Sequence, residues 1–363
     1  MVKKVYVGMS GGVDSSVTAA LLKQHGYDVT GVYMKNWSKD LPGFPCPWKE
    51  DYQDAKRVAV QLDIPFKMYD FETQYRQKVV DYMVAEYQAG RTPNPDIMCN
   101  QEIKFKLFLD TALEDGADLV ATGHYARVTQ TTENQVQDPS YHKLDGVELR
   151  MGVDRNKDQT YFLYRVTEVA LTKTLFPIGD LTKPQVRQLA KKFKLVTATK
   201  KESMGICFVG KVGIKDFLLN ELGPQQPGKI LDQSGQVIGQ HEGAIFYTIG
   251  QRHGLDVGGG LPYYVIGKDI AKNEVFVTTD LDDKKLWHKE LSLKDLHWIN
   301  NAPVEGKTYQ VRTRHRAPLL DCEIKHKQNV TYVTLKDEVR AATPGQSAVI
   351  YDNDLVLGGG IIT

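Results

Sequence analysis

A glycine-rich turn between a short apolar run and a helical run is the feature that most constrains this chain. The turn, residues 9–16 (MSGGVDSS), follows a strand predicted from Lys4 to Val7 and precedes a helix predicted from Val17 to His25. Glycines let the backbone approach a ligand closely, and the free amides and dipole of a helix N-terminus favour an anion. Strand, turn and helix in this order therefore predict a phosphate-binding loop.

The residue types in the turn narrow the kind of loop. Hydroxyls of Ser10, Ser15 and Ser16 add hydrogen-bond donors. No Gly-Lys-[Ser/Thr] follows, so the stretch is not a Walker A loop, and the local sequence offers no lysine that can reach β- and γ-phosphates. The stretch is not a G-x-G-x-x-G loop either. The alternative is an ordinary turn whose helix is capped by Asp14 or Ser15. We interpret the complete S-G-G-V-D-S-S stretch as a phosphate site.

The first half of the chain alternates between strand and helix patterns. Further strands are predicted at 29–34, 64–69 and 119–122, and further helices at 52–62, 72–88 and 103–113. This alternation predicts an α/β fold with a doubly wound parallel sheet, and the family resemblance given below implies that it is an adenine-nucleotide domain. With 363 residues the chain is long enough for two or three domains.

After about residue 210 the pattern changes to short β-like runs separated by turns, beginning near the linker GPQQPG at 223–228. We expect two small mainly-β domains there. The predicted domains are 1–210, which carries the phosphate loop, 211–280, a small central β domain, and 281–363, a C-terminal β-barrel.

Composition excludes several classes of protein. A hydrophobic content of 41% and a charged content of 25% are ordinary for a globular chain, and the net charge of +1 means that any nucleic-acid site must come from local basic clusters. No apolar run reaches the length of a membrane helix, and the N-terminus leaves no room for a targeting segment, so we expect a cytoplasmic protein. The four cysteines, Cys46, Cys99, Cys207 and Cys322, are far apart and lack metal-ligand spacing, so no metal site is predicted from protein ligands.

Two of these cysteines lie in informative segments. In RTPNPDIMCN (91–100) two prolines stiffen the loop, and Asn100 could cap a following helix, which would hold Cys99 outside a positive helix end and favour its thiolate. Asp96 could handle a proton; the alternative is a structural loop with a passive cysteine. In ESMGICFVG (202–210) the apolar surroundings of Cys207 favour burial, although Lys200 and Lys201 upstream could stabilise a thiolate.

Other side chains are candidates for contacts with RNA. Alternation in VRTRHR (311–316) would place Arg312, Arg314 and Arg316 on one face of a strand, where they suit phosphates, and the alternative is a solvated edge strand. Tyr125 or Trp37 could stack on a base, although burial in the core is the expected fate of both.

At this point the motifs resemble a known family. SGGVDSS resembles the pyrophosphate loop of N-type ATP pyrophosphatases. GRTPNPDIMCN and GICFVG, together with GVYMKNW, ATGHYAR, NKDQTYFL, YTIGQRHGL, RTRHR, PGQSAV and LGGGII in the same order, resemble the tRNA-specific 2-thiouridylase (MnmA/TrmU) family across nearly the whole chain.

The resemblance implies an enzyme that adenylates O2 of the anticodon wobble uridine with ATP and Mg²⁺ and replaces it with sulfur from a persulfide. It implies Cys99 as nucleophile, Cys207 as persulfide carrier and Asp96 as a catalytic group, with Asn94, Pro95 and Asp96 at the target base. The implied ATP site comprises Gly8, Met9, Ser10, Gly11, Gly12, Val13, Asp14, Ser15, Met34 and Gly123. The implied tRNA contacts are His124, Lys157, Asp158, Gln159, Arg314, His315 and Gln346. The implied partners are a tRNA anticodon loop and a sulfur donor protein, a cysteine desulfurase or a persulfide relay protein.

Three positions depart from the family pattern: Met98, Met204 and the segment GKVGIKDF at 210–217, which is less basic than usual. The third puts a local tRNA contact in doubt, but not the chemistry. Two alternative functions are another adenylating synthetase with this loop and a tRNA-binding protein without activity.

Overall fold

The computed structural model describes residues 2–43, 45–130, 146–201, 213–255, 257–258, 260–327 and 330–363. The first part of the chain builds a five-stranded sheet in the order β3-β2-β1-β4-β7, and every neighbouring pair is parallel. Its strands are β1 (Lys4–Gly8), β2 (Asp28–Lys35), β3 (Phe66–Asp70), β4 (Leu119–Thr122) and β7 (Thr174–Leu175).

Helices cover both faces of this sheet. Alternate residues of β1 enter two separate apolar clusters: Val5 and Val7 pack with α1 (Val13–Gln24), α2 (Trp48–Gln61) and α8 (Lys183–Lys192), whereas Tyr6 packs with the helices of residues 72–114. Strand side chains alternate between faces, so a sheet covered on both sides must be apolar at successive positions. The predicted doubly wound α/β fold is confirmed.

Of the two long helices of the second face, the first has the bounds that the sequence pattern indicated and the second is longer. Residues 72–88 form α3 (Glu72–Tyr75), the π-helical segment η1 (Arg76–Val80) and α4 (Asp81–Gln88); residues 95–114 form α5 (Pro95–Met98), the π-helical segment η2 (Cys99–Leu107) and α6 (Phe108–Glu114). The expected cap at Asn100 is wrong. The helix begins eight residues before the predicted start, because Asn94 Oδ1 accepts from the Ile97 amide at 3.4 Å and Pro95 occupies the first helical position, where its missing N–H costs nothing.

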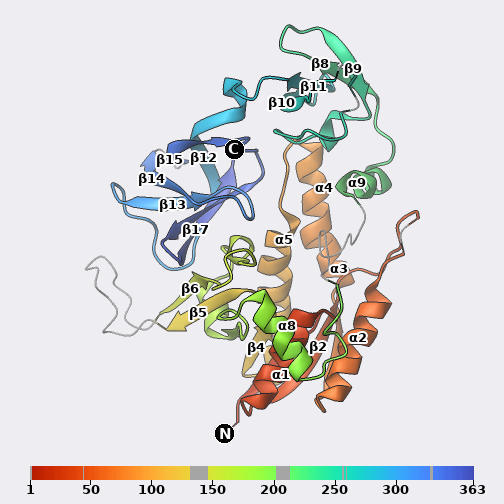
Figure 1. Cartoon of the computed structure of the whole chain (residues 1–363), viewed down its shortest axis with the longest axis vertical. Helices are drawn as coiled ribbons and strands as arrows, with labels where there is room; N and C mark the ends of the chain where they lie inside the picture. Colours follow the sequence, from red (N-terminus) through yellow and green to blue (C-terminus); the bar gives the residue numbers. More distant parts are fainter. Residues whose placement is uncertain are drawn as a thin grey trace.

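A small central unit follows. It contains α9 (Ile214–Leu222) and a sheet in the order β10-β11-β8-β9, formed by β8 (Gly228–Leu231), β9 (Val237–His241), β10 (Tyr264–Asp269) and β11 (Glu274–Thr278). Ile230, Val265, Val275 and Val277 are its buried apolar centre. Figure 1 shows this unit in green and cyan above the parallel sheet, with α4 reaching up to it.

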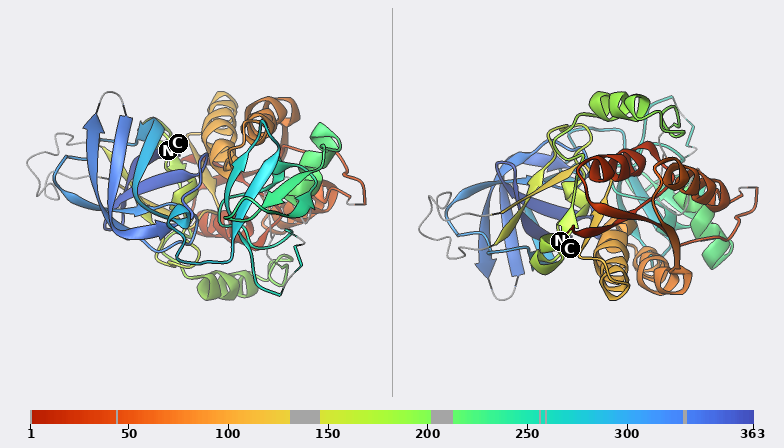
Figure 2. Two further views of the ribbon diagram at one scale, coloured as in Figure 1. Left: turned by 90° about the horizontal axis from the view of Figure 1, so that it is seen from above. Right: turned by 90° about the horizontal axis from the view of Figure 1, so that it is seen from below.

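The third unit is a β-barrel. Most of its strands lie in residues 287–362, but two of them come from residues 126–151 in the first half of the chain. Its sheet runs β12-β15-β14-β13-β16-β17-β6-β5, and a further pairing of β12 with β17 closes it. The strands are β5 (Ala126–Gln130), β6 (Val147–Met151), β12 (Trp287–Trp298), β13 (Thr308–Arg312), β14 (Leu320–Lys327), β15 (Val330–Arg340), β16 (Ser347–Asp352) and β17 (Leu355–Ile362). The remaining helices are η4 (Thr160–Phe162), α7 (Glu168–Thr172), η5 (Ala244–Phe246) and η6 (Lys284–Leu286). Figure 2, viewed along the long axis, shows this barrel and the central unit on opposite sides of the molecule.

Candidate active site

A cavity of about 340 Å³ opens beside the carboxyl ends of β1 and β4. The strand order is β3-β2-β1-β4, so β2 and β3 are added on one side of β1 and β4 on the other side. Open α/β sheets bind ligands at such a point, where the strand order reverses. Its described lining residues are Gly8, Ser10, Gly12, Val13, Asp14, Ser15, Met34, Lys104, Thr122, Gly123, His124, Tyr125, Lys157, Gln159, Lys183, Lys201, His315 and Arg316.

The glycine-rich turn shapes one wall of the cavity. Gly11 has a φ of +74°, and a Cβ there would lie 2.3 Å from the Asp51 carbonyl oxygen. Gly123 at the end of β4 lies against the same turn, because a Cβ on it would be 2.7 Å from the Ser15 amide nitrogen. Both positions need glycine for close approach of two backbones.

The start of α1 is left open to an anion. The N-cap residue is Gly12, and among the described residues no side chain caps the first amides, so the alternative of a turn capped by Asp14 or Ser15 is wrong. Ser15 Oγ instead accepts from the Ser10 amide at 3.2 Å, and Ser16 Oγ donates to the Gly12 carbonyl at 2.7 Å. Uncapped amides at the end of a 12-residue helix can bind phosphate oxygens.

Most of the residues predicted for ATP line this cavity. They are Gly8, Ser10, Gly12, Val13, Asp14, Ser15, Met34 and Gly123. Met9 and Gly11 are not in the lining: the Met9 side chain is buried against Gly31, and Gly11 forms the turn beside Asp51. These two residues contribute to the packing and the backbone conformation of the loop but do not line the cavity.

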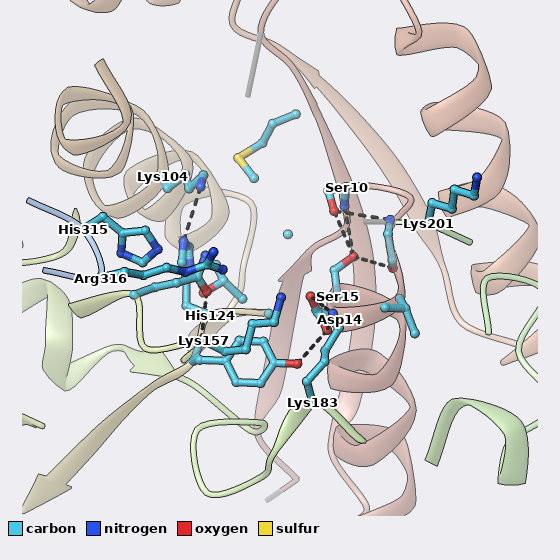
Figure 3. A pocket seen from close by; sticks show the side chains of 18 residues that line it. Ser10, Asp14, Ser15, Lys104, His124, Lys157, Lys183, Lys201, His315 and Arg316 are labelled. Atoms are coloured by element: carbon cyan, nitrogen blue, oxygen red, sulfur yellow. Dashed lines mark hydrogen bonds and ion pairs between the residues drawn. The ribbon is translucent and has the colours of Figure 1, made fainter. Parts of the chain in front are cut away.

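Positive charge dominates the described lining. Lys104, Lys157, Lys183, Lys201 and Arg316 face one carboxylate, that of Asp14. Figure 3 shows Lys104, His124, Lys157, His315 and Arg316 on one wall and Ser10, Asp14, Ser15, Lys183 and Lys201 on the other. The local sequence offers no lysine for a phosphate, but the fold brings lysines from distant segments to the loop.

Lys183, the first residue of α8, is held directly on the loop. Its Nζ lies 2.8 Å from both carboxylate oxygens of Asp14, and the Tyr125 hydroxyl donates to Asp14 Oδ1 at 2.9 Å. The Lys183 side chain is only 12% exposed. This arrangement holds a mostly covered ammonium group beside the glycine-rich turn.

Two histidines in the cavity are uncharged near neutral pH. Burial, followed by the nearby Lys104 charge, holds the pKa of His124 well below its usual value. Lys104 Nζ, a donor, is 3.4 Å from His124 Nε2, so Nδ1 carries the proton and donates to Thr122 Oγ1 at 2.7 Å. Burial and neighbouring cations lower the pKa of His315 to about 4, and its ring packs on Phe162 at 4.6 Å. The two rings therefore offer neutral, partly apolar surfaces.

The loop that carries Cys99 is clamped by the other two units. Gln346 Nε2 donates to the Thr92 carbonyl at 2.9 Å, and the Thr92 amide donates to the Pro344 carbonyl at 2.9 Å. Thr92 Oγ1 also meets Thr248 Oγ1 of the central unit at 3.0 Å. A Cβ on Gly345 would lie 2.8 Å from the Thr92 nitrogen, so this contact requires glycine.

Cys99 itself is 1% exposed and begins η2, so it lies within a helix, not outside a helix end as expected. It does not line the cavity, but Lys104, five residues further along the same helix, does. Five residues advance a helix by about 7 Å, so one helix carries both Cys99 and a residue of the cavity wall. Asp96 lies in the first turn of α5, and Pro95 is buried beside the capping Asn94. Cys207 lies outside the described residues.

The residues predicted for tRNA fall into two groups. His124, Lys157, Gln159 and His315 line the cavity. Asp158, Arg314 and Gln346 instead make contacts within the protein: Asp158 Oδ2 accepts from Arg312 Nη1 at 3.1 Å, with both side chains buried, and Arg314 Nη2 donates to the Ala341 carbonyl at 2.6 Å. The expected arginine face is wrong, because β13 ends at Arg312 and the residues after it form a loop.

Sequence reasoning missed Lys104 and Lys183, assigned Lys201 only to a thiolate, and placed Arg316 on a strand face although it lies in the loop after β13. None of them carries a local signal, since their position at the loop depends on packing between segments. Tyr125 and Trp37 are buried, at 2% and 7% exposure, as expected for core residues. Tyr125 also forms part of the cavity wall.

Within the described ranges no group of three or more His, Cys, Asp or Glu residues has metal-ligand geometry. In the same ranges no helix has the length and apolar character needed to cross a membrane.

Three family models cover the chain in succession. The "tRNA methyl transferase HUP domain" matches residues 3–211, the "tRNA methyl transferase PRC-barrel domain" matches 215–279 and the "Aminomethyltransferase beta-barrel domain" matches 288–362.

Whole-chain relatives are more specific. The chain is 46% identical over 366 residues to "tRNA-specific 2-thiouridylase MnmA" of Bacillus subtilis (strain 168), a match that covers 99% of this chain and 94% of the relative. It is 47% identical over 363 residues to the protein of the same name in Listeria monocytogenes serotype 4a (strain HCC23), with the same coverage. It is 45% identical over 366 residues to that of Enterococcus faecalis (strain ATCC 700802 / V583), covering 99% and 95%.

The domain descriptions mention methyl transfer, whereas the relatives that match from end to end are named for thiolation. A match across all three structural units identifies a protein more specifically than the description of one domain, and it confirms the resemblance carried by the motifs. The chain therefore belongs to the tRNA-specific 2-thiouridylase family.

Proposed function

We propose that this chain is an ATP-dependent tRNA-uridine 2-sulfurtransferase and that the cavity beside β1 and β4 is its reaction chamber. One observation carries the proposal: an uncapped helix N-terminus and a glycine-rich turn face five cationic side chains, an arrangement suited to a triphosphate next to an RNA strand. The neutral rings of His124 and His315 on the opposite wall suit a nucleobase.

The chemistry replaces one oxygen by sulfur in two stages. O2 of the wobble uridine attacks the α-phosphorus of ATP, the bond to diphosphate breaks and diphosphate leaves. The adenylated O2 is then a good leaving group, and a sulfur nucleophile attacks C2 as the C2–O2 bond breaks and AMP departs. The cations of the cavity stabilise the charge that develops on the leaving phosphates.

Sulfur arrives as a persulfide on Cys207, loaded by a sulfur donor protein. In one order Cys99 attacks Cys207 Sγ and displaces hydrosulfide, which attacks C2. In the other order the terminal persulfide sulfur attacks C2, and Cys99 then breaks the S–S bond to release 2-thiouridine. Both orders end with a Cys99–Cys207 disulfide, which an external thiol reductant must reduce before the next turnover.

The family motif assigns Asn94, Pro95 and Asp96 to the target base. Their placement on the clamped loop supports this role, because the barrel and the central unit fix the start of α5. Asp96 is proposed to accept the uridine proton. Lys157, Asp158, Gln159, Arg314 and Gln346 are proposed to bind or shape the surface that receives tRNA.

Mg²⁺ fits this site as a partner of the triphosphate. Asp14, the single carboxylate in the described lining, can contribute one ligand, and Mg²⁺ usually takes its other ligands from phosphates and water. When bound, it would screen the negative charge of the triphosphate. Cytoplasmic location is part of the proposal, since tRNA, ATP and reduced thiols are available together there.

Mass spectrometry of tRNA nucleosides tests the function. The protein is incubated with a wobble-uridine tRNA, ATP, Mg²⁺, a persulfide donor and a thiol reductant, and diphosphate release is measured in parallel. We expect 2-thiouridine from the wild type and none from Cys99→Ser or Cys207→Ser, whereas Cys322→Ser, which alters a buried barrel cysteine, should retain the product. Diphosphate release without 2-thiouridine in the wild type would indicate another adenylating enzyme, and no release at all would indicate a binding protein.

A further inference from the structure

A second cavity lies between the central unit and the barrel. Its volume is about 400 Å³, within the range of ligand pockets. The described lining residues are Gly250, Trp287, Thr313, Arg314, Ala317, Pro318, Leu320, Glu338, Val339, Arg340 and Ala341.

Arg340 is the distinctive residue of this cavity. Its guanidinium carbon lies 4.6 Å from the ring centroid of Tyr264, which belongs to the central unit, so stacking holds it in place across the boundary between units. Within the described part of the chain its guanidinium takes part in no hydrogen bond or ion pair, and its Nε and Nη2 are buried. A guanidinium without an acceptor favours an anionic ligand.

An aromatic ring lies beside this arginine. Trp287 of β12 is directly opposite Arg340 of β15 in the antiparallel register, so both side chains project on the same face of the sheet. The indole is fixed by Nε1, which donates to the Leu281 carbonyl at 2.8 Å. A fixed aromatic ring next to an arginine is the combination that binds an unstacked nucleotide.

One loop contributes residues to the walls of both cavities. The loop after β13 contributes Thr313, Arg314, Ala317 and Pro318 to the second cavity, and it contributes His315 and Arg316 to the first. Arg314 and Arg316 are two positions apart, which corresponds to about 7 Å of chain. An RNA strand that delivers a base to the first cavity would therefore bring a neighbouring nucleotide to the second.

We propose that this second cavity is a nucleotide subsite for the tRNA substrate, in which Arg340 binds a backbone phosphate and Trp287 stacks on a base that flanks the target uridine. Arg314 adds a second positive charge, while Glu338 lies at the rim and disfavours a ligand with more than one phosphate. The subsite rests on the proposed function only in its choice of RNA as ligand. Its role is positioning of the substrate, not chemistry.

The test uses the full chain and an RNA hairpin with the anticodon loop of a wobble-uridine tRNA. Arg340→Gln should weaken hairpin binding about 5- to 10-fold and lower the slope of log K against log salt by about 0.7, the value for one lost contact to a single strand. In thiolation assays KM for RNA should rise by the same factor with kcat unchanged. Lys325→Gln, which removes an exposed lysine outside both cavities, should leave the salt slope at the wild-type value.

Further variants keep the proposal falsifiable. Binding of a non-hydrolysable ATP analogue shows whether Arg340→Gln is folded; if it is not, Arg340→Lys and Trp287→Leu take its place, and each should weaken hairpin binding. Wild-type hairpin affinity in these variants, or an equal loss in Lys325→Gln, would overturn the subsite. Failure of the wild type to make 2-thiouridine while Arg340→Gln still weakens hairpin binding would refute the proposed function and support the subsite.

Discussion

Replacing Lys183 with glutamine tests whether the first cavity holds a triphosphate. In the wild type the Lys183 ammonium lies 2.8 Å from both Asp14 oxygens and neutralises the one carboxylate among the described lining residues. Glutamine is similar in length but has no charge, so Asp14 would face the phosphates uncompensated. The variant thus removes one attractive interaction and exposes one repulsive interaction.

The size of the effect follows from the geometry. Two unit charges about 4 Å apart interact by about 4 kcal/mol at an effective dielectric constant of about 20, which is appropriate to a side chain that is mostly covered. Remaining cations and Mg²⁺ compensate part of this loss. We therefore expect about 1.4–2.8 kcal/mol, which is a 10- to 100-fold increase in Kd for ATP.

Calorimetric titration with a non-hydrolysable ATP analogue and Mg²⁺ measures this change. Lys191→Gln is the matched control, because Lys191 lies on the same helix, is exposed and should leave Kd unaltered. The double variant Asp14→Asn/Lys183→Gln should bind better than Lys183→Gln alone if repulsion by the carboxylate contributes. A Kd for Lys183→Gln within twofold of the wild type would refute the electrostatic reasoning.

Three further predictions concern backbone approach, a buried ion pair and pH. Gly123→Ala should reduce ATP-analogue affinity at least about 10-fold, since its Cβ would lie 2.7 Å from a loop amide, whereas Gly258→Ala, with open space around it, should not. Asp158→Asn should lower the thermal midpoint in calorimetry, because an unpaired buried Arg312 costs about 3–5 kcal/mol; an unchanged midpoint would contradict this. The pKa of His315 is lowered to about 4 in the folded protein, so the unfolded chain binds more protons than the folded protein between pH 6.5 and 4. The thermal midpoint should therefore fall as pH decreases through this window. In His315→Phe the midpoint should fall less steeply over the same window.

The path of the backbone at the glycine-rich turn could be predicted because its causes are local. A short apolar strand, positive-φ glycine and a helix start within about ten residues leave few arrangements, and α1 follows β1 as expected. The alternation of strand and helix patterns also predicted a parallel sheet with helices on both faces, whereas the order of its strands came only from the structure. The error at Asn100 arose because Asn94-Pro95 is itself a helix start, and a proline at the first helical position was interpreted only as a stiff loop.

The sequence by itself indicated the family and therefore the class of chemistry. The glycine-rich loop and the cysteine motifs are short contiguous stretches, so their residue types can be recognised without knowledge of the fold. Only the tertiary structure decided which charges meet that loop. Lys183 is 169 positions from Asp14, and Gln346 is 254 positions from Thr92. Such pairs form because packing of α8 on the sheet and of the barrel on the Cys99 loop brings them together, and no local periodicity encodes a distance of that kind.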